Sequence, residues 1–240
     1  MLHRLRGFAL SRRSGNPEYF ARQERKRARP SVTSAAWLAL RNRNTILAPW
    51  LAQVPADGVV LDVGGAIQPY RRLINSQNYI GLDLWRTPRV NVVADAVRLP
   101  IRDNSIDAVI CTGVLQSTDD PQAAVGEMSR VLKPGGLMIL GVVSLAPNLE
   151  PKDRWRFDFS ELHKLLDGLH DIDIVPECAT VATFFTLSLH RFARTKFWWG
   201  LAMKPIIVLL NLLALIAEKT TLPNYNYTLS YAVRARKPPH

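Results

Sequence analysis

Five short apolar runs, separated by helix-like or loop segments, constrain the fold more than any other feature of the chain. They cover residues 59–63, 79–84, 91–95, 106–112 and 137–143. Continuous apolar runs of this length are typical of strands that are buried on both faces of a parallel sheet. The connecting segments, such as the helix-like stretch at 120–132, have the length that parallel strands require. The pattern predicts an α/β fold with a doubly wound, Rossmann-like sheet.

The size and cysteine content set further bounds. The chain has 240 residues, of which 48% are hydrophobic, which is enough for one main core. Its two cysteines, Cys111 and Cys178, belong to no CxxC motif or Cys/His cluster, so we expect neither a disulfide framework nor a metal site. A reducing compartment, the cytoplasm, is the expected location.

The positive charge is concentrated at the start of the chain. Residues 1–30 carry nine Arg and Lys residues against two Glu, and so hold seven of the eleven net positive charges. Such a segment can act as a mitochondrial-type presequence or as an electrostatic contact for anionic lipid or nucleic acid. We favour a solvated, partly disordered basic leader over residues 1–33. The long uncharged run of a secretory signal is missing, so export is not expected.

The strand ends carry the candidate ligand site, because ligands of doubly wound sheets bind beyond the carboxyl ends of the strands. Asp62 ends the first run and is followed by Gly64 and Gly65, while Asp83 ends the second run and Asp95 the third. The dinucleotide pattern G-x-G-x-x-G matches only at its first position, counted from either glycine. A ligand without phosphates can do without the later glycines. A nicotinamide-dependent oxidoreductase remains an alternative.

The same residues carry a resemblance to a known family. The stretches VVLDVGGAIQPYRRL, YIGLDL and NVVADAVRLPIRDNSIDAVICTGVLQSTDDPQAAVGEMSRVLKPGG occur in this order within residues 57–145. They resemble the class I S-adenosylmethionine-dependent methyltransferases, particularly the small-molecule and glycan-type branch. The resemblance implies a seven-stranded sheet with an antiparallel last strand, a helical lid before that strand, and S-adenosyl-L-methionine as cofactor.

The resemblance also assigns roles to residues. Asp62 would face the ammonium group of the cofactor, Asp83 its ribose, and Asp95 with the backbone N–H of Ala96 its adenine. The glycines would let the backbone pass close to the ligand. The full predicted cofactor set is Asp62, Gly64, Gly65, Asp83, Asp95, Ala96 and Thr112.

Two positions depart from the family pattern. Ala66 stands where the second glycine of Asp-x-Gly-x-Gly would fall, and Gln116–Ser117 replaces a common Glu-His pair. A methyltransferase-like protein that binds the cofactor without turnover is therefore a further alternative.

The expected reaction is methylation of a small molecule, saccharide or lipid-linked glycan, with oxygen as the expected acceptor atom. Methyl transfer depends mainly on alignment, so a general base is optional. The loop before the sixth strand offers Asp153, Asp158 and His163 as bases, and Trp155 and Arg156 for contact with the acceptor. The chain contains no Asn-Pro-Pro-Tyr-like or Pro-Cys motif, so a nucleic-acid substrate is not expected, although the basic leader could bind a phosphate backbone.

Two further helical regions are predicted, one before the main domain and one inserted within it. Residues 34–56 predict one or two short helices broken by Pro49, and 57–240 form the main domain with a helical insertion at about 178–220. The uncharged core at 206–217 would span about 18 Å, short of the roughly 30 Å of a bilayer core. We favour burial of this helix within the fold over peripheral membrane contact through 197–218, for which Trp198 and Trp199 are suited.

Overall fold

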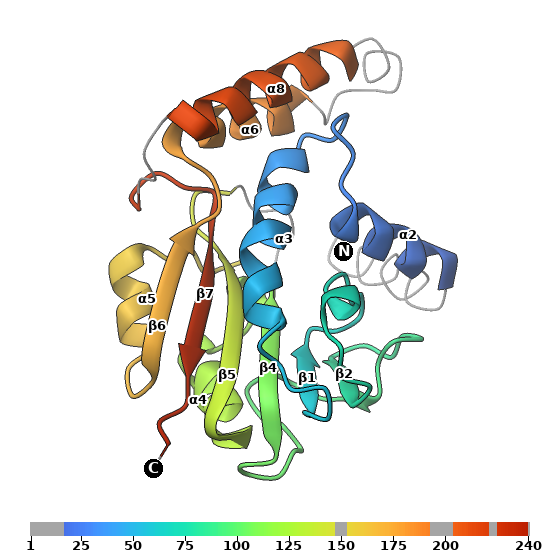
Figure 1. The fold of residues 1–240 in the computed structure, drawn as a ribbon, viewed down its shortest axis with the longest axis vertical. Helices are drawn as coiled ribbons and strands as arrows, with labels where there is room; N and C mark the ends of the chain where they lie inside the picture. The colour runs from blue at the N-terminus through green and yellow to red at the C-terminus, as the bar shows by residue number, and fades with distance from the viewer. Residues whose placement is uncertain (1–16, 147–152, 193–203, 221–224, 240) are drawn as a thin grey trace, which may run out of the picture.

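A seven-stranded mixed sheet forms the centre of the molecule (Figure 1). The structure is a computed structural model that describes residues 17–146, 153–192, 204–220 and 225–239. The strand order is β3-β2-β1-β4-β5-β7-β6; the first five strands run parallel, and β7 pairs antiparallel with β5 and β6. The predicted α/β class, seven strands and antiparallel last strand are confirmed. The strands are β1 (Val60–Val63), β2 (Tyr79–Asp83), β3 (Val92–Val93), β4 (Ile106–Thr112), β5 (Leu132–Val143), β6 (His170–Pro176) and β7 (Ser230–Arg236).

Helices cover both faces of the sheet, because successive side chains along a strand point to opposite sides. Leu61 and Val63 belong to the core beneath α4 (Pro121–Val131) and α5 (Phe159–Leu165). Val60, which precedes Leu61, packs on the opposite side with α3 (Trp37–Leu51). Two short 3-10 helices, η1 (Arg71–Leu73) and η2 (Leu115–Ser117), follow β1 and β4.

Two local expectations differ from the structure. Pro49 does not break the helix but lies in the last turn of α3, where its missing N–H removes one hydrogen bond. The third strand was expected to have five residues, and the structure has only Val92–Val93. Residues 133–136 after α4 form an irregular start of β5, with Gly135 at φ +74°.

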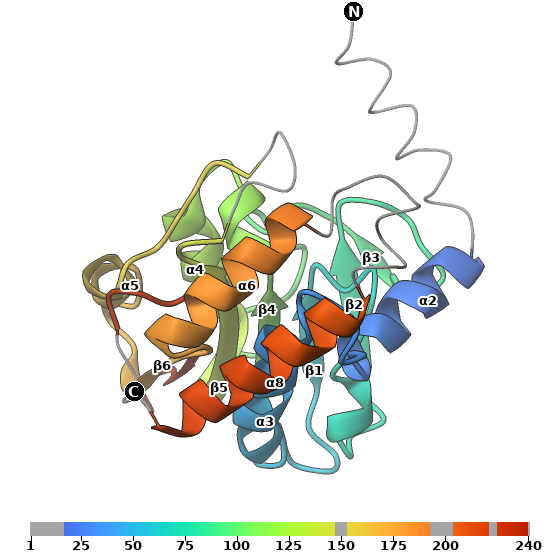
Figure 2. The same cartoon turned by 90° about the horizontal axis from the view of Figure 1, so that it is seen from above.

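The helical insertion between β6 and β7 consists of α6 (Thr180–Phe192) and α8 (Lys204–Thr220). The two helices lie side by side across the end of the sheet at which the parallel strands stop (Figures 1 and 2). Their inner faces form a small core with Leu38 of α3. Among the described residues, no helix is both long and apolar enough to span a bilayer. Trp198 and Trp199 lie outside the described residues, and the predicted role as a lid stays a prediction.

The basic leader is not structureless over its second half. Residues 17–28 form α2 (Pro17–Ala28), whereas 1–33 were expected to be partly disordered. Proline at its first position and Glu18 in its first turn suit a helix N-terminus, and three basic residues suit its last turn. Residues 1–16 lie outside the described part. The helix α2 lies beside the ends of β1 and β2, which brings it to the candidate site (Figure 2).

Candidate active site

Two adjoining cavities open where β1, β2 and β4 end. The larger has a volume of about 510 Å³ and the smaller of about 300 Å³. They share a wall formed by Gly64, Asp83, Trp85, Gly113 and Val114. Ligands bound in the two cavities would therefore contact the same five residues.

The structure brings most of the predicted cofactor residues to these cavities. Asp95 and Ala96 complete the larger cavity, and Thr112 lines the smaller one. Asp62 and Gly65 line neither of them. Five of the seven residues predicted from the strand ends therefore line the cavities, and their contact with a cofactor stays a prediction.

Asp62 is buried, and its carboxylate accepts a hydrogen bond of 2.7 Å from the hydroxyl of Tyr79. Burial raises the pKa of Asp62 to about 7, the Tyr79 hydrogen bond lowers it, and the nearby Asp83 carboxylate adds to the rise. The side chain thus lies within the protein below the glycine loop, and its predicted contact with an ammonium group stays a prediction.

The glycine loop brings backbone close to the shared wall. Gly64 has φ +81°, a conformation that other residues rarely adopt, and a Cβ there would lie 2.2 Å from the Cγ2 atom of Val114. A Cβ at Gly65 would lie 2.8 Å from the carbonyl oxygen of Asp62. Gly64 therefore shapes the cavity, whereas Gly65 lets the loop pack on the sheet.

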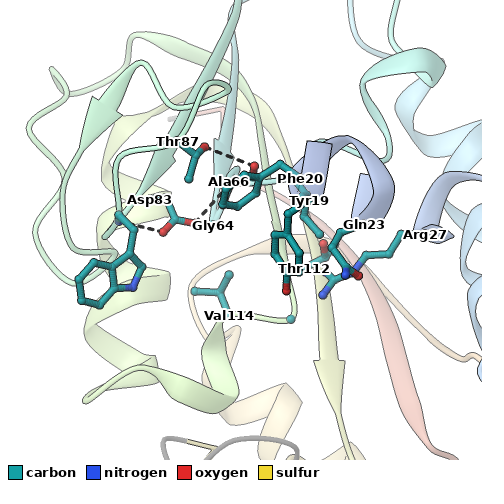
Figure 3. A pocket seen from close by; sticks show the side chains of 13 residues that line it. Tyr19, Phe20, Gln23, Arg27, Gly64, Ala66, Asp83, Thr87, Thr112 and Val114 are labelled. Carbon is teal, nitrogen blue, oxygen red and sulfur yellow. Dashed lines mark hydrogen bonds between the residues drawn. The ribbon is translucent and has the colours of Figure 1, made fainter. Parts of the chain in front are cut away.

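Asp83 faces both cavities and also orders the loops around it (Figure 3). Its two carboxylate oxygens accept hydrogen bonds from the backbone N–H groups of Trp85 at 3.0 Å and Ala66 at 3.3 Å. Burial raises the pKa of Asp83, and these hydrogen bonds oppose that rise. Asp95 similarly accepts from the N–H of Val97 at 3.2 Å.

The substrate and base candidates of the following loop lie elsewhere. Trp155 and Arg156 line a separate surface hollow between α4 and α5. Asp158 caps α5 by accepting the backbone N–H of Glu161 at 2.7 Å, and this contact lowers its pKa. His163 is exposed and packs edge-on against Phe159. None of these four lines either cavity, because the cap fixes the start of α5 away from the strand ends.

Two features of the site were not predicted, namely the contact between Ser117 and Asp153 and the wall formed by α2. Ser117, in the larger cavity, donates a hydrogen bond of 2.7 Å to the Asp153 carboxylate, so Asp153 is the candidate base linked to the cleft. The smaller cavity is closed on one side by α2, through Tyr19, Phe20, Gln23 and Arg27 (Figure 3). Aromatic residues within a basic segment were the only sequence signal for this wall.

The electrostatics of the larger cavity suit a cationic ligand without phosphates. Its described lining includes Asp83, Asp95 and Asp119 and no Arg or Lys side chain; Asp119 is paired with Arg154 outside the cavity. The ammonium and sulfonium groups of S-adenosyl-L-methionine fit such a lining, and phosphates would not. Asp83 and Asp95 are the residues that would hold its ribose and adenine.

Comparison with known proteins agrees with this chemistry. Residues 61–140 match the family model described as "Methyltransferase domain". Together with the sheet order, this match makes the chain similar to the class I methyltransferases, a class that uses S-adenosyl-L-methionine.

The relatives match over limited regions. The chain is 35% identical to a tRNA (carboxymethyluridine(34)-5-O)-methyltransferase of Arabidopsis thaliana over 108 residues, 40% of this chain and 26% of the relative. It is 42% identical to a demethylmenaquinone methyltransferase of Renibacterium salmoninarum over 60 residues, 25% of each chain. The matched regions thus span about a quarter of these curated relatives.

Solved structures share the fold. A phosphoethanolamine N-methyltransferase 2 of Haemonchus contortus, solved with S-adenosylhomocysteine, superposes with a TM-score of 0.54 at 17% identity, covering 82% of this chain and 52% of that one. The [4+2]-cyclase SpnF superposes with a TM-score of 0.52 at 23% identity, covering 84% and 82%.

Proposed function

We propose that this protein is an S-adenosyl-L-methionine-dependent methyltransferase that acts on a small-molecule acceptor, with oxygen as the atom methylated. The observation that carries the proposal is the acidic larger cavity joined by a shared wall to a smaller one. The first suits a cationic donor and the second an acceptor that touches it. At about 300 Å³, the smaller cavity has the size of a small-ligand pocket rather than of a macromolecular groove.

The protein's contribution is alignment. When bound, the donor supplies a methyl group on a sulfonium: the acceptor's lone pair forms the new bond, the C–S electron pair stays on sulfur, and the acceptor hydroxyl loses its proton. Gly64, Gly113 and Val114 line both cavities and would set the approach of the two ligands. The released proton passes to water, since a general base is optional; Asp153 is bonded to Ser117 at the larger cavity and does not line the smaller one.

Two other functions are alternatives to methyl transfer, and each would give a different experimental result. A neighbour of the same fold is named as a cyclase, so the fold alone does not establish methyl transfer. A protein that binds the cofactor without turnover is the first alternative. A nicotinamide oxidoreductase is the second, and the family match counts against it.

We further propose peripheral contact with an anionic membrane through the outer face of α6 and α8. Ile206, Leu209, Leu213 and Ile216 recur at helical spacing on α8 and are all exposed, and Phe184 on α6 is 58% exposed. Exposed Lys204 and Lys219 stand at the two ends of α8, a charge arrangement that favours anionic lipid.

The decisive experiment for the methyltransferase proposal uses donor labelled in the methyl group. We expect the protein to bind the donor and to transfer label to an organic-soluble or small aqueous product when it is incubated with fractionated cell extract. Asp83→Ala, which removes the ribose partner, should abolish both donor binding and label transfer.

Tight donor binding with no transfer to any fraction would favour the protein that binds the cofactor without turnover, and binding of NAD but not of the methyl donor would favour the oxidoreductase. Label in the RNA fraction would contradict the small-molecule acceptor.

A further inference from the structure

The helix α2 forms one wall of the smaller cavity with a single face. The face begins at Tyr19 and continues with Phe20, Gln23 and Arg27, which follow Tyr19 by one, four and eight positions. This spacing places the four side chains along one side of the helix. The facing wall comes from the loops after β1, β2 and β4: Gly64, Ala66, Ile67, Asp83, Trp85, Thr87, Thr112, Gly113 and Val114. Figure 3 shows the α2 side chains pointing toward these loops.

The position of α2 is fixed by polar contacts rather than by a core. The helix has no buried residue. Its C-terminal carbonyls accept hydrogen bonds from Arg72, at 2.8 Å to Ala28, and from Asn44, at 3.1 Å to Arg27. Glu24 forms an ion pair with Arg89 at 3.2 Å. The aromatic pair of α2, Tyr19 and Phe20, is half-buried and lines the cavity.

The chemistry of this cavity differs from that of its larger neighbour. Tyr19 and Phe20, in edge-to-face contact at 5.5 Å, stand opposite Trp85, Ile67 and Val114, so the walls are aromatic and aliphatic. The polar groups that α2 adds are the hydroxyl of Tyr19, the amide of Gln23 and the guanidinium of Arg27, and the Asp83 carboxylate belongs to the facing wall. Because the cation stands on the α2 side and the carboxylate on the facing wall, the flat apolar walls fit a planar ring whose anionic substituent points toward Arg27.

We propose that α2 forms the acceptor site and that the acceptor is a small planar phenol or hydroquinone carrying an anionic group. Phe20 and Tyr19 contact the ring, and Arg27 with Gln23 binds the anionic substituent. The proposal rests on the proposed function, since it places the acceptor beside a donor held by Asp83 and Asp95.

The test measures binding of two matched probes in the presence of saturating S-adenosylhomocysteine. The probes are 1-hydroxy-2-naphthoate, a planar phenol with a carboxylate, and 1-naphthol, the same ring without the charge. We expect the carboxylate probe to bind wild-type protein at least about tenfold more tightly than 1-naphthol. Arg27→Gln should remove this difference, and Phe20→Ala should weaken both probes by about tenfold. The affinity for S-adenosylhomocysteine should change less than about twofold in both variants.

Arg25→Gln is the matched control, because Arg25 lies on the same helix, is exposed, and does not line the cavity. It makes the same charge change and should leave both probes unaffected. Thermal unfolding midpoints of all variants show whether each remains folded. If Phe20→Ala weakens S-adenosylhomocysteine as much as the probes, α2 belongs to the donor site and the proposal is wrong. If wild-type protein binds S-adenosylhomocysteine but neither probe, the acceptor class is wrong. A wild-type protein that does not bind S-adenosylhomocysteine contradicts the proposed function itself.

Discussion

At the scale of single residues, Asp62 illustrates how a carboxylate at a strand end can serve the fold. It is 4% exposed and has one hydrogen-bond donor, the hydroxyl of Tyr79. Its pKa of about 7 means that the native state holds a proton there over a range of pH in which the unfolded chain has lost it. An ionised Asp62 therefore costs the folded protein free energy.

This cost predicts a specific pH dependence of stability. The folded pKa lies above the unfolded value of 3.8, so the native state binds more protons between the two values. The free energy of unfolding should fall by at most roughly 4 kcal/mol as the pH rises through this range. Above about pH 7 it should be constant. Asp62→Asn should abolish this fall, as measured by urea unfolding at several pH values.

Asp57→Asn, at an exposed position, is the matched control and should retain the wild-type pH dependence. An identical slope in Asp62→Asn and wild type would show that Asp62 titrates normally in the folded protein.

The close contact between Gly64 and Val114 gives a second prediction. Gly64→Ala places a Cβ about where the Val114 methyl lies and at a positive φ, so it should weaken donor binding by more than about tenfold. Val114→Ala removes the clashing methyl but not the backbone strain, which costs roughly 1 kcal/mol. The double variant should recover part of the affinity, as measured by calorimetry with S-adenosylhomocysteine. No recovery in the double variant would mean that backbone strain alone accounts for the loss.

The same residues show what the sequence could predict about the site. Strand ends are visible as the last polar residue of an apolar run, so Asp83 and Asp95 were correctly placed at the cleft. The direction of a side chain is not visible, and Asp62, one strand residue away from the loop, points into the protein. Arg156 lies in a separate hollow, beside the start of α5 that Asp158 caps, and its predicted contact with the acceptor stays a prediction.

At the scale of elements, α2 was not predicted because its composition is polar, whereas helices that pack on a core have an apolar face. Half of its twelve residues are charged and none is buried, so it has too few apolar residues to be recognised as a packed helix. Its position depends on Arg72, Asn44 and Arg89, which come from distant parts of the chain. Contacts of this kind cannot be inferred from a local sequence pattern. The helices α6 and α8, in contrast, were predicted from their apolar runs.

Asn211 connects α8 with the segment that carries α2. It is fully buried, and its amide donates hydrogen bonds of 2.7 Å to the carbonyl of Val32 and 3.0 Å to that of Ser34. Asn211→Ala should leave both carbonyls without this donor and reduce the free energy of unfolding by about 2 kcal/mol. Amide hydrogen exchange should accelerate within residues 17–36, since this segment loses an anchor.

Leu212→Ala, at the exposed neighbouring position of α8, is the control and should leave exchange in 17–36 unchanged. Equal acceleration in both variants would point to a general loosening of α8 instead of a specific clamp.

At the scale of the whole molecule, the candidate site and the apolar face occupy the same end. The cavities open where the parallel strands stop, and α6 and α8 lie across that end with α2 beside them (Figures 1 and 2). The half of α8 that faces inward includes Ile207, Asn211 and Ala214, so burial within the fold accounts for only one side of this apolar helix. Its other side is exposed and is available to a surface outside the protein. A bilayer in contact with this face would lie near the openings of the cavities.

Binding to vesicles tests this arrangement. The full chain should sediment with phosphatidylglycerol-containing vesicles and much less with pure phosphatidylcholine, because both apolar insertion and positive charge contribute. Raising the ionic strength to about 1 M should weaken the electrostatic part of the binding.

Leu209→Gln with Ile216→Gln should reduce vesicle binding by about tenfold or more, since both side chains would lose apolar burial. Val93→Gln with Tyr227→Gln, two exposed residues outside this face, is the matched control. If the protein instead forms a dimer without lipid and the Leu209 and Ile216 changes dissociate it, a second copy covers this face and the membrane proposal is wrong.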